Sequence, residues 1–111
     1  MYGKVKIGDK EVGMLANAAS PYIYKQVFGE DFLVEVQKPT PASDLFQKMA
    51  FIMAKQAETD KISELMKVKI EGFYEWLGEF EAMDVMIATK EISELYFTQT
   101  KSTSVPKSEG G

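Results

Sequence analysis

The chain has 111 residues and a formal net charge of −4, and 45% of its residues are hydrophobic and 27% charged, as is typical of one soluble globular domain. It contains no cysteine and no histidine, which excludes disulfides, thiolate or imidazole metal sites and the most common general base. All 13 basic residues are lysine, and an acidic chain without arginine argues against nucleic-acid binding, although lysine-only usage also fits an A/T-rich genome.

The N-terminal segment has the alternating pattern of a β-hairpin over about residues 3–16. Val5 and Ile7 alternate with lysines, the segment Gly8–Lys10 offers a turn, and the alternation resumes after it. Because an isolated hairpin is only marginally stable in water, its apolar face should pack against the rest of the chain.

Two short helices are predicted next. Ser20 is a suitable N-cap with Pro21 in the first helical position, and Gly29 provides a left-handed stop. Asp31 can cap the second helix, which ends at the prolines of residues 39–41. The residues expected to face inward in this second helix are Phe32, Leu33 and Val36.

The clearest helix covers residues 42–57, with Thr40 or Ser43 as its cap. Its apolar residues recur at i, i+4, i+7 and i+8, and two phenylalanines widen this stripe. The stripe consists of Leu45, Phe46, Met49, Phe51, Ile52, Met53 and Gln56.

The C-terminal half should contain three further helical segments. Ile62, Leu65 and Met66 indicate one short helix. Residues 69–80 indicate a longer one, in which Phe73 and Trp76 should anchor the core between the last two helices. The last helix starts near Ala82 and carries Val85, Met86, Ile92, Leu95 and Tyr96. It should fade by Thr98, because residues 98–111 are rich in Ser, Thr and Lys and are expected to be a disordered tail.

These elements predict a mainly α fold with a small N-terminal β-hairpin, which is a single-domain helical bundle, or α+β if the hairpin is counted. The domain should span residues 1–97. No apolar run reaches the ~20 residues that span a bilayer, and no apolar stretch follows the charged N-terminus, so neither a membrane anchor nor a signal peptide is expected.

No catalytic, cofactor-binding or metal site is predicted, and the chain is expected not to be an enzyme. Glu71, Glu75 and Glu79 share one helical face, which indicates a solvated surface or a docking site for a basic partner. A helical di-iron site would need histidine, and no serine has a histidine partner.

The large supply of methionine and aromatic residues has two interpretations. One is ordinary core packing. The other is an exposed apolar groove for a helix of another chain, since methionine adapts to varied partners. The groove is expected on the 42–57 helix, with Phe46, Met49, Phe51 and Met53 as partner-binding residues.

The order of elements, together with the segments Lys4–Val12, Tyr24–Leu33 (YKQVFGEDFL) and Phe73–Leu77 (FYEWL), resembles the tail assembly chaperones of long-tailed (siphovirus-type) bacteriophages. The likeness covers roughly residues 3–97. It implies a protein of the host cytoplasm that binds the helical, apolar tape-measure protein, keeps it soluble and promotes polymerisation of the tail tube around it.

The resemblance also implies partners beyond the tape-measure protein. A longer form made by a translational frameshift would recruit the tail-tube protein, with residues 98–111 at the start of its linker, and the chain is expected to self-associate. Two other functions stay open, namely a structural completion or connector protein of the tail and a regulatory adaptor.

Overall fold

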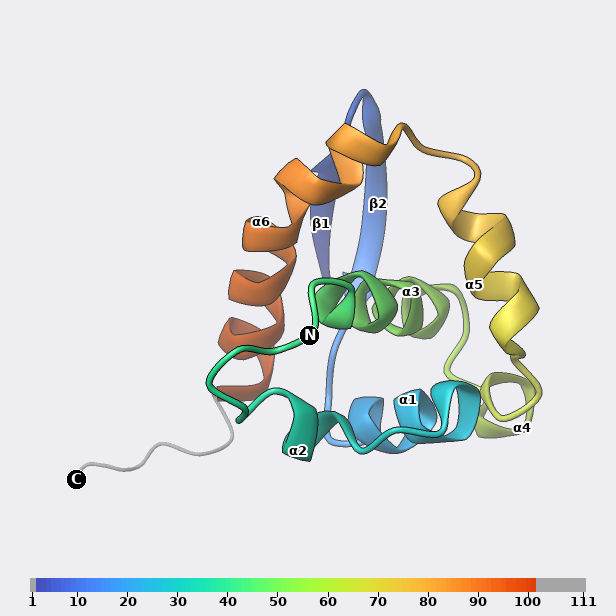
Figure 1. Cartoon of the computed structure of the whole chain (residues 1–111). Helices are drawn as coiled ribbons and strands as arrows, with labels where there is room; N and C mark the ends of the chain where they lie inside the picture. The colour runs from blue at the N-terminus through green and yellow to red at the C-terminus, as the bar shows by residue number, and fades with distance from the viewer. Residues whose placement is uncertain (1, 102–111) are drawn as a thin grey trace.

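The computed structural model describes residues 2–101, and within them the chain forms one antiparallel hairpin and six helices (Figure 1). The elements in chain order are β1 (Tyr2–Ile7), β2 (Lys10–Leu15), α1 (Ser20–Phe28), α2 (Phe32–Glu35), α3 (Leu45–Glu58), α4 (Ile62–Leu65), α5 (Ile70–Leu77) and α6 (Ala82–Lys101). The predicted class, mainly α with a small N-terminal hairpin, is confirmed.

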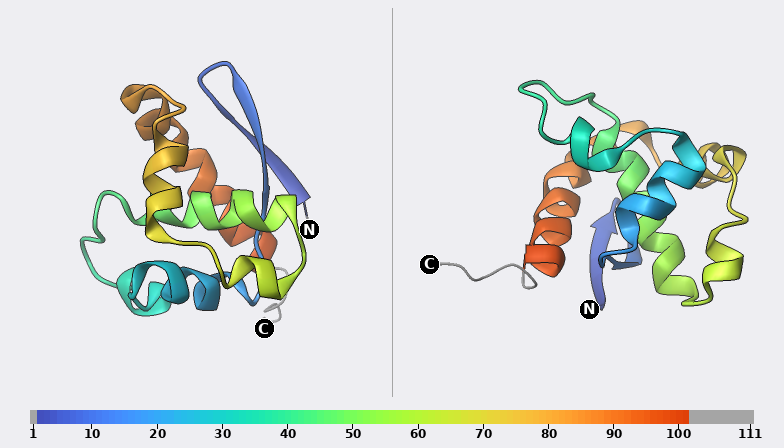
Figure 2. Two further views of the ribbon diagram at one scale, coloured as in Figure 1. Left: turned by 90° about the vertical axis from the view of Figure 1, so that its right-hand side faces the viewer. Right: turned by 90° about the horizontal axis from the view of Figure 1, so that it is seen from below.

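The helix α3 lies at the centre of the fold, as the views in Figures 1 and 2 show. It contacts β2, α1, α5 and α6. Because other elements cover it on several sides, its apolar residues are buried on more than one face. The buried residues of α3 are Leu45, Met49, Ala50, Phe51, Ile52, Met53, Ala54 and Gln56.

The hairpin follows from its turn and its alternation. Gly8 has a φ of 66°, which glycine adopts without steric cost, and it occupies the first of the two positions between the strands. In the observed register Val5 is opposite Val12 and Ile7 is opposite Lys10. Val5 and Ile7 are buried, and β1 packs along α6, so the hairpin is held by the helices as expected.

Two of the three predicted helix caps are wrong. Ala19 is the N-cap of α1, and the hydroxyl of Ser20 instead accepts a hydrogen bond from the Asn17 N–H and donates one to Gln56 Oε1. Asp44 precedes α3 without a side-chain cap, in place of Thr40 or Ser43. Both sequence predictions assumed that a capping hydroxyl serves its own helix, whereas Ser20 serves a tertiary contact.

The cap and the stop around the first two helices are confirmed. Asp31 accepts hydrogen bonds from the N–H groups of Leu33 and Val34, and Gly29 ends α1 with a φ of 73°. The orientation of Leu33 is corrected, because this side chain is exposed while Phe32 is fully buried. A helix of four residues can turn only part of its surface to the core.

The C-terminal helix is longer than predicted. It continues to Lys101, so the expectation of a disordered tail is wrong for residues 98–101. Gln99 is buried in this last turn and accepts a hydrogen bond from the Ala16 N–H. The rest of the predicted tail, residues 102–111, lies outside the described residues.

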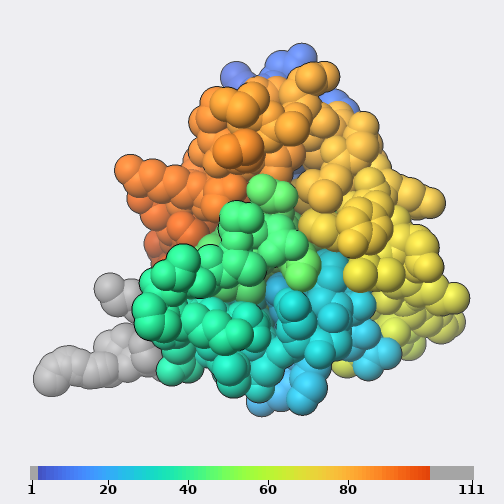
Figure 3. Space-filling view, in the orientation of Figure 1, coloured from blue at the N-terminus to red at the C-terminus, as the bar shows by residue number. Residues whose placement is uncertain are grey.

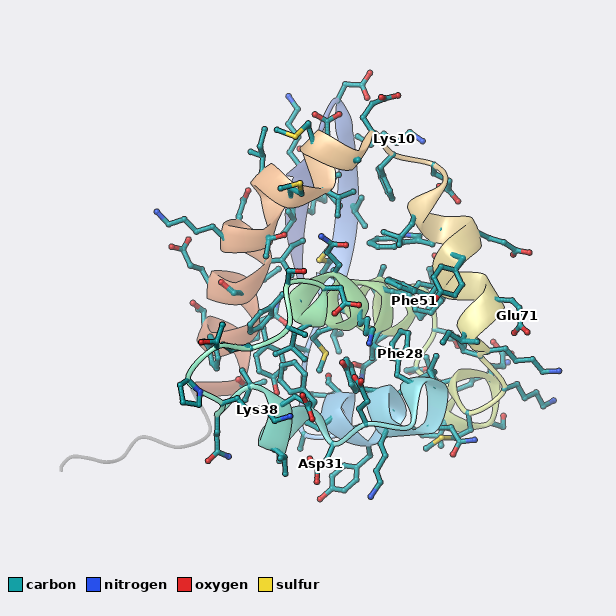
Figure 4. The ribbon with its side chains drawn as sticks, in the orientation of Figure 1. Lys10, Phe28, Asp31, Lys38, Phe51 and Glu71 are labelled. Atoms are coloured by element: carbon teal, nitrogen blue, oxygen red, sulfur yellow. The ribbon has the colours of Figure 1, made fainter. Side chains whose placement is uncertain are left out.

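Aromatic rings join α5 to the central helix. Phe73 is buried, with its ring 5.2 Å from that of Phe28 and 5.7 Å from that of Phe51. The ring centres of Trp76 and Phe51 are 5.8 Å apart. Figure 4 shows Phe28 and Phe51 in the space between α1 and α3. The predicted burial of Phe73 and Trp76 in the core is confirmed. Their predicted place between the last two helices is wrong, because the rings that they meet belong to α1, α3, α5 and the α5–α6 connection.

Candidate partner-binding surface

The four residues predicted to line a groove do not form an exposed surface. Met49, Phe51 and Met53 are fully buried. Phe46 is half-buried, with its ring between those of Phe32 at 5.7 Å and Phe97 at 5.8 Å. The placement of the groove on the 42–57 helix is therefore corrected, because packing of other elements on several sides of α3 already uses its wide apolar stripe.

A different helix carries the exposed methionines. At the start of α6, Met83, Met86 and Ile87 are 62%, 59% and 71% exposed. Their i, i+3, i+4 spacing places them on one side of the helix. We call these three residues the α6 apolar face, and Figure 3 shows the first half of α6 on the surface at the top of the molecule.

The opposite side of α6 is packed in the core. Its buried apolar residues are Val85, Ala88, Ile92 and Tyr96. This inner stripe lies against β1 and α3. The α6 apolar face is therefore surplus to the core of this chain, and burial of such side chains on a partner is favourable by about 1.5–3 kcal/mol for each one fully buried.

Sequence reasoning missed this face because α6 has apolar residues on two sides. The two apolar stripes of α6 differ in their continuity along the sequence. The inner stripe continues at helical spacing from Val85 to Tyr96, whereas the outer one is interrupted by Lys90 and Glu94. A stripe unbroken over three turns is the one that a helix of this length buries along a core.

A second apolar hollow lies between the end of α1 and the α4–α5 connection. It encloses about 410 Å³. Its apolar lining is Val27, Met66, Val68 and Ile70, and its polar lining is Gln26, Lys67, Lys69 and Glu71. Met66 and Ile70 are each only 38% exposed, so this hollow offers less apolar surface than the α6 apolar face.

The acidic stripe of the sequence is divided in the structure. Glu71, Glu75 and Glu79 are all exposed, but α5 ends at Leu77, so Glu79 lies beyond the helix. Glu71 borders the hollow near α1, whereas Glu75 and Glu79 border a groove beside β2. Within residues 2–101 none of the three forms an ion pair, and no group of three or more metal-ligating side chains is arranged to hold a metal ion.

Tyr24 and Glu30, whose pKa values are shifted by their surroundings, belong to a group of side chains that joins α1 to α3. The Tyr24 hydroxyl donates a hydrogen bond to Glu30 Oε1 at 3.0 Å, and Lys48 Nζ lies 3.2 Å from the same oxygen. Burial, and then the bond to Glu30, raise the pKa of Tyr24 well above its usual range. Burial raises the pKa of Glu30, but the hydrogen bonds from Tyr24 and Lys48 outweigh it and leave this pKa below its usual value. We interpret this group as a structural link between the two helices.

Among residues 2–101, no helix combines the length and the apolar character needed to cross a bilayer. Comparison of the chain with protein-family models, with curated proteins and with solved structures finds no match.

Proposed function

We propose that this chain is a non-enzymatic tail assembly chaperone of a long-tailed bacteriophage, and that it binds apolar helical segments of the tape-measure protein through the α6 apolar face. The observation that carries the proposal is the exposure of Met83, Met86 and Ile87 on one side of a helix whose other side is already packed. The resemblance of the hairpin and of the YKQVFGEDFL and FYEWL segments to this family supports the same function.

The spacing of the face suits a helical partner. Residues at i, i+3 and i+4 form an apolar patch on one side of a helix, and such side chains pack into the grooves between the side chains of a partner helix. Methionine has three rotatable bonds and a polarisable sulfur, so Met83 and Met86 can adapt to the varied apolar side chains of a long partner. Further along the same side of α6, Lys90 and Glu94 add charges of both signs at the edge of the contact.

Such a contact keeps the partner soluble by covering its apolar stripe until the tube encloses it. Several copies of the chain, and their self-association, would be needed along a long helix. A longer frameshifted form that carries a domain for the tail-tube protein would then bring tube subunits to the coated helix.

The test is co-expression of the candidate tape-measure protein with and without the chain. We expect soluble partner and a co-eluting complex only when the chain is present. The triple variant Met83→Gln, Met86→Gln, Ile87→Gln should lose the complex. The matched control is Leu33→Gln with Val34→Gln, which removes the exposed apolar residues of α2, 47% and 55% exposed, and should keep it.

The outcomes separate the function from the surface. Equal solubility of the partner with and without the chain would overturn the chaperone function. If the α2 control loses the complex and the α6 variant keeps it, the binding surface lies on α2 and not on α6. Calorimetry of the complex should give a negative heat-capacity change and weak salt dependence, because apolar burial drives the contact. Stoichiometric amounts of the chain in purified tails would favour a structural tail component instead.

A further inference from the structure

The hairpin has one strand edge that borders a groove. The groove encloses about 440 Å³ between β2, α3 and α5. Lys10, Glu11, Val12 and Gly13 form one wall, and Gly72, Glu75, Trp76, Glu79 and Phe80 form the other. In Figure 1, β2 and α5 both rise from the level of α3. We call the groove that these residues line the β2–α5 groove.

The register of the hairpin determines which N–H and C=O groups of β2 point away from β1. Ile7 and Lys10 flank the two-residue turn and are therefore a hydrogen-bonded pair, and such pairs alternate with non-hydrogen-bonded ones along an antiparallel ladder. Glu11, opposite Lys6, and Gly13, opposite Lys4, belong to the second kind. Their N–H and C=O groups point away from β1.

Nothing in residues 2–101 uses these backbone groups. No turn, loop or side-chain hydrogen bond reaches the main chain of Glu11 or Gly13. β1 contacts α6, where the side chain of Leu95 lies against Gly3, and β2 contacts α3. What distinguishes β2 is that Glu11 and Gly13 border the groove. A strand edge with unused N–H and C=O groups is a template for pairing with another extended chain.

The charges around the groove define the chemistry of its occupant. The lining has four carboxylates (Glu11, Glu58, Glu75 and Glu79) and two ammonium groups (Lys10 and Lys55). Lys55 is paired with Glu58 at 3.6 Å, and Glu11 is paired with Lys4 at 3.9 Å. Glu75 and Glu79 keep carboxylates without an ion pair within the described residues.

Lys10 shows how a basic side chain fits this groove. Its ammonium group donates a hydrogen bond to the Glu79 carbonyl oxygen at 3.1 Å and lies 5.3 Å from the centre of the Phe80 ring. Figure 4 shows Lys10 near the tip of the hairpin, beside the connection from α5 to α6. An ammonium group is thus received here by an oxygen acceptor and an aromatic face.

We propose that the β2–α5 groove binds an extended segment of a partner protein that adds a third strand to β2. The segment alternates lysine or arginine with apolar residues, so that its basic side chains meet Glu75 and Glu79 and its apolar side chains meet Trp76, Phe80 and Ala54. The four residues of β2 in the groove span about 13 Å, which is the length of four residues of an extended partner. This surface is separate from the α6 apolar face and does not depend on the function proposed for it.

Synthetic peptides test the strand pairing on the unmodified protein. The probe is acetyl-SVKVKVS-amide, in two further forms that are N-methylated either on all its valines or on all its lysines. Because alternate residues point their N–H groups to the same edge of a strand, each methylated form blocks one edge only. We expect one form to bind like the parent peptide and the other to bind at least about tenfold more weakly, since several hydrogen bonds are lost together.

Two outcomes with these peptides overturn the proposal. Equal weakening of both methylated forms would show that the peptide does not bind as an added strand. Absence of peptide binding, together with a concentration-dependent dimer of the chain, would make the occupant a second copy instead.

A matched pair of variants identifies the edge. Glu11 and Lys6 lie opposite each other, both are exposed, and the N–H of each points outside the ladder. Proline is tolerated at such positions of edge strands. We expect Glu11→Pro to abolish peptide binding and Lys6→Pro to preserve it, while Glu11→Gln, which keeps the N–H, should weaken it only slightly. Equal effects of the two proline variants would overturn the assignment to β2.

The carboxylates are tested by Glu75→Gln with Glu79→Gln. Loss of two exposed charge contacts should weaken the peptide by about threefold to tenfold and reduce the salt dependence of binding. The control, Glu91→Gln with Glu94→Gln, removes two exposed charges of α6 and should leave binding unchanged. If the control weakens peptide binding as much as Glu75→Gln with Glu79→Gln does, only the net charge of the protein matters for binding.

Discussion

The backbone N–H of Ala16 donates a hydrogen bond to the side-chain oxygen of Gln99, although 83 residues separate the two positions. Both residues are buried, so the bond joins the segment after β2 to the last turn of α6 away from water. The bond therefore links the exit of the N-terminal hairpin to the C-terminal turn of α6.

Replacement of Gln99 should destabilise the whole fold. Gln99→Ala leaves the buried N–H of Ala16 without its acceptor, which costs about 1–3 kcal/mol of unfolding free energy. The neighbouring residue Thr98 is exposed, so Thr98→Ala should change stability by less than about 0.5 kcal/mol. Urea unfolding of the two variants and the parent protein measures the difference. Equal stability of Gln99→Ala and the parent would show that the bond contributes nothing.

Phe73→Ala should cost about 3–5 kcal/mol, because the ring packs between Phe28 and Phe51 and its removal leaves a cavity in the core. The adjacent Tyr74 is 62% exposed, and Tyr74→Ala should cost under about 1 kcal/mol. Thermal and urea unfolding of both variants provides the comparison. A Phe73→Ala variant that melts at the parent temperature would contradict the burial of this ring.

Acid should weaken the link between α1 and α3 through Glu30. The hydrogen bonds from Tyr24 and Lys48 hold the pKa of Glu30 below its usual value of 4.5. A group with a lowered folded-state pKa stabilises the fold above its unfolded pKa and loses this contribution as the pH falls through the folded value. The stability difference between the parent and Glu30→Gln should therefore be largest near neutral pH and shrink below about pH 4.5.

Unfolding curves of both proteins from about pH 7 to about pH 3 test this dependence. The carboxylate is partly exposed, so a small difference is expected and its direction is the informative result. A difference that grows as the pH falls would contradict the assignment.

Gly8→Ala should destabilise the hairpin turn. A left-handed backbone costs a residue with a Cβ atom about 1–2 kcal/mol, and a Cβ at Gly8 would also lie 2.5 Å from Asp84 Oδ2. Gly29 has a similar φ, but a Cβ there would meet no atom within 4 Å, so Gly29→Ala isolates the backbone strain. We expect Gly8→Ala to be the more destabilising of the two, and Asp84→Ala to reduce the excess. Equal losses would show that Asp84 moves aside freely.

Local patterns were sufficient to predict most of the elements. The alternation around Val5 and Ile7 identified the hairpin, and Gly29 and Asp31 marked the boundary between α1 and α2, because these signals act through the backbone of neighbouring residues. They could not predict the end of α6. Thr98 and Gln99 lack apolar character, and the last turn gains its stability from the distant N–H of Ala16.

The candidate binding surface shows the same division. The sequence by itself determined how much apolar material the chain has, that α6 carries Met86 beside Val85, and that no histidine or cysteine is present. Only the tertiary structure decided which of these side chains remain in contact with solvent. Met49, Phe51 and Met53 are covered because neighbouring elements surround α3, whereas Met83, Met86 and Ile87 stay exposed because α6 packs on one side only. Burial depends on which element packs on each face of a helix. Periodicity along the chain shows which residues share a face, but it does not show what packs against that face.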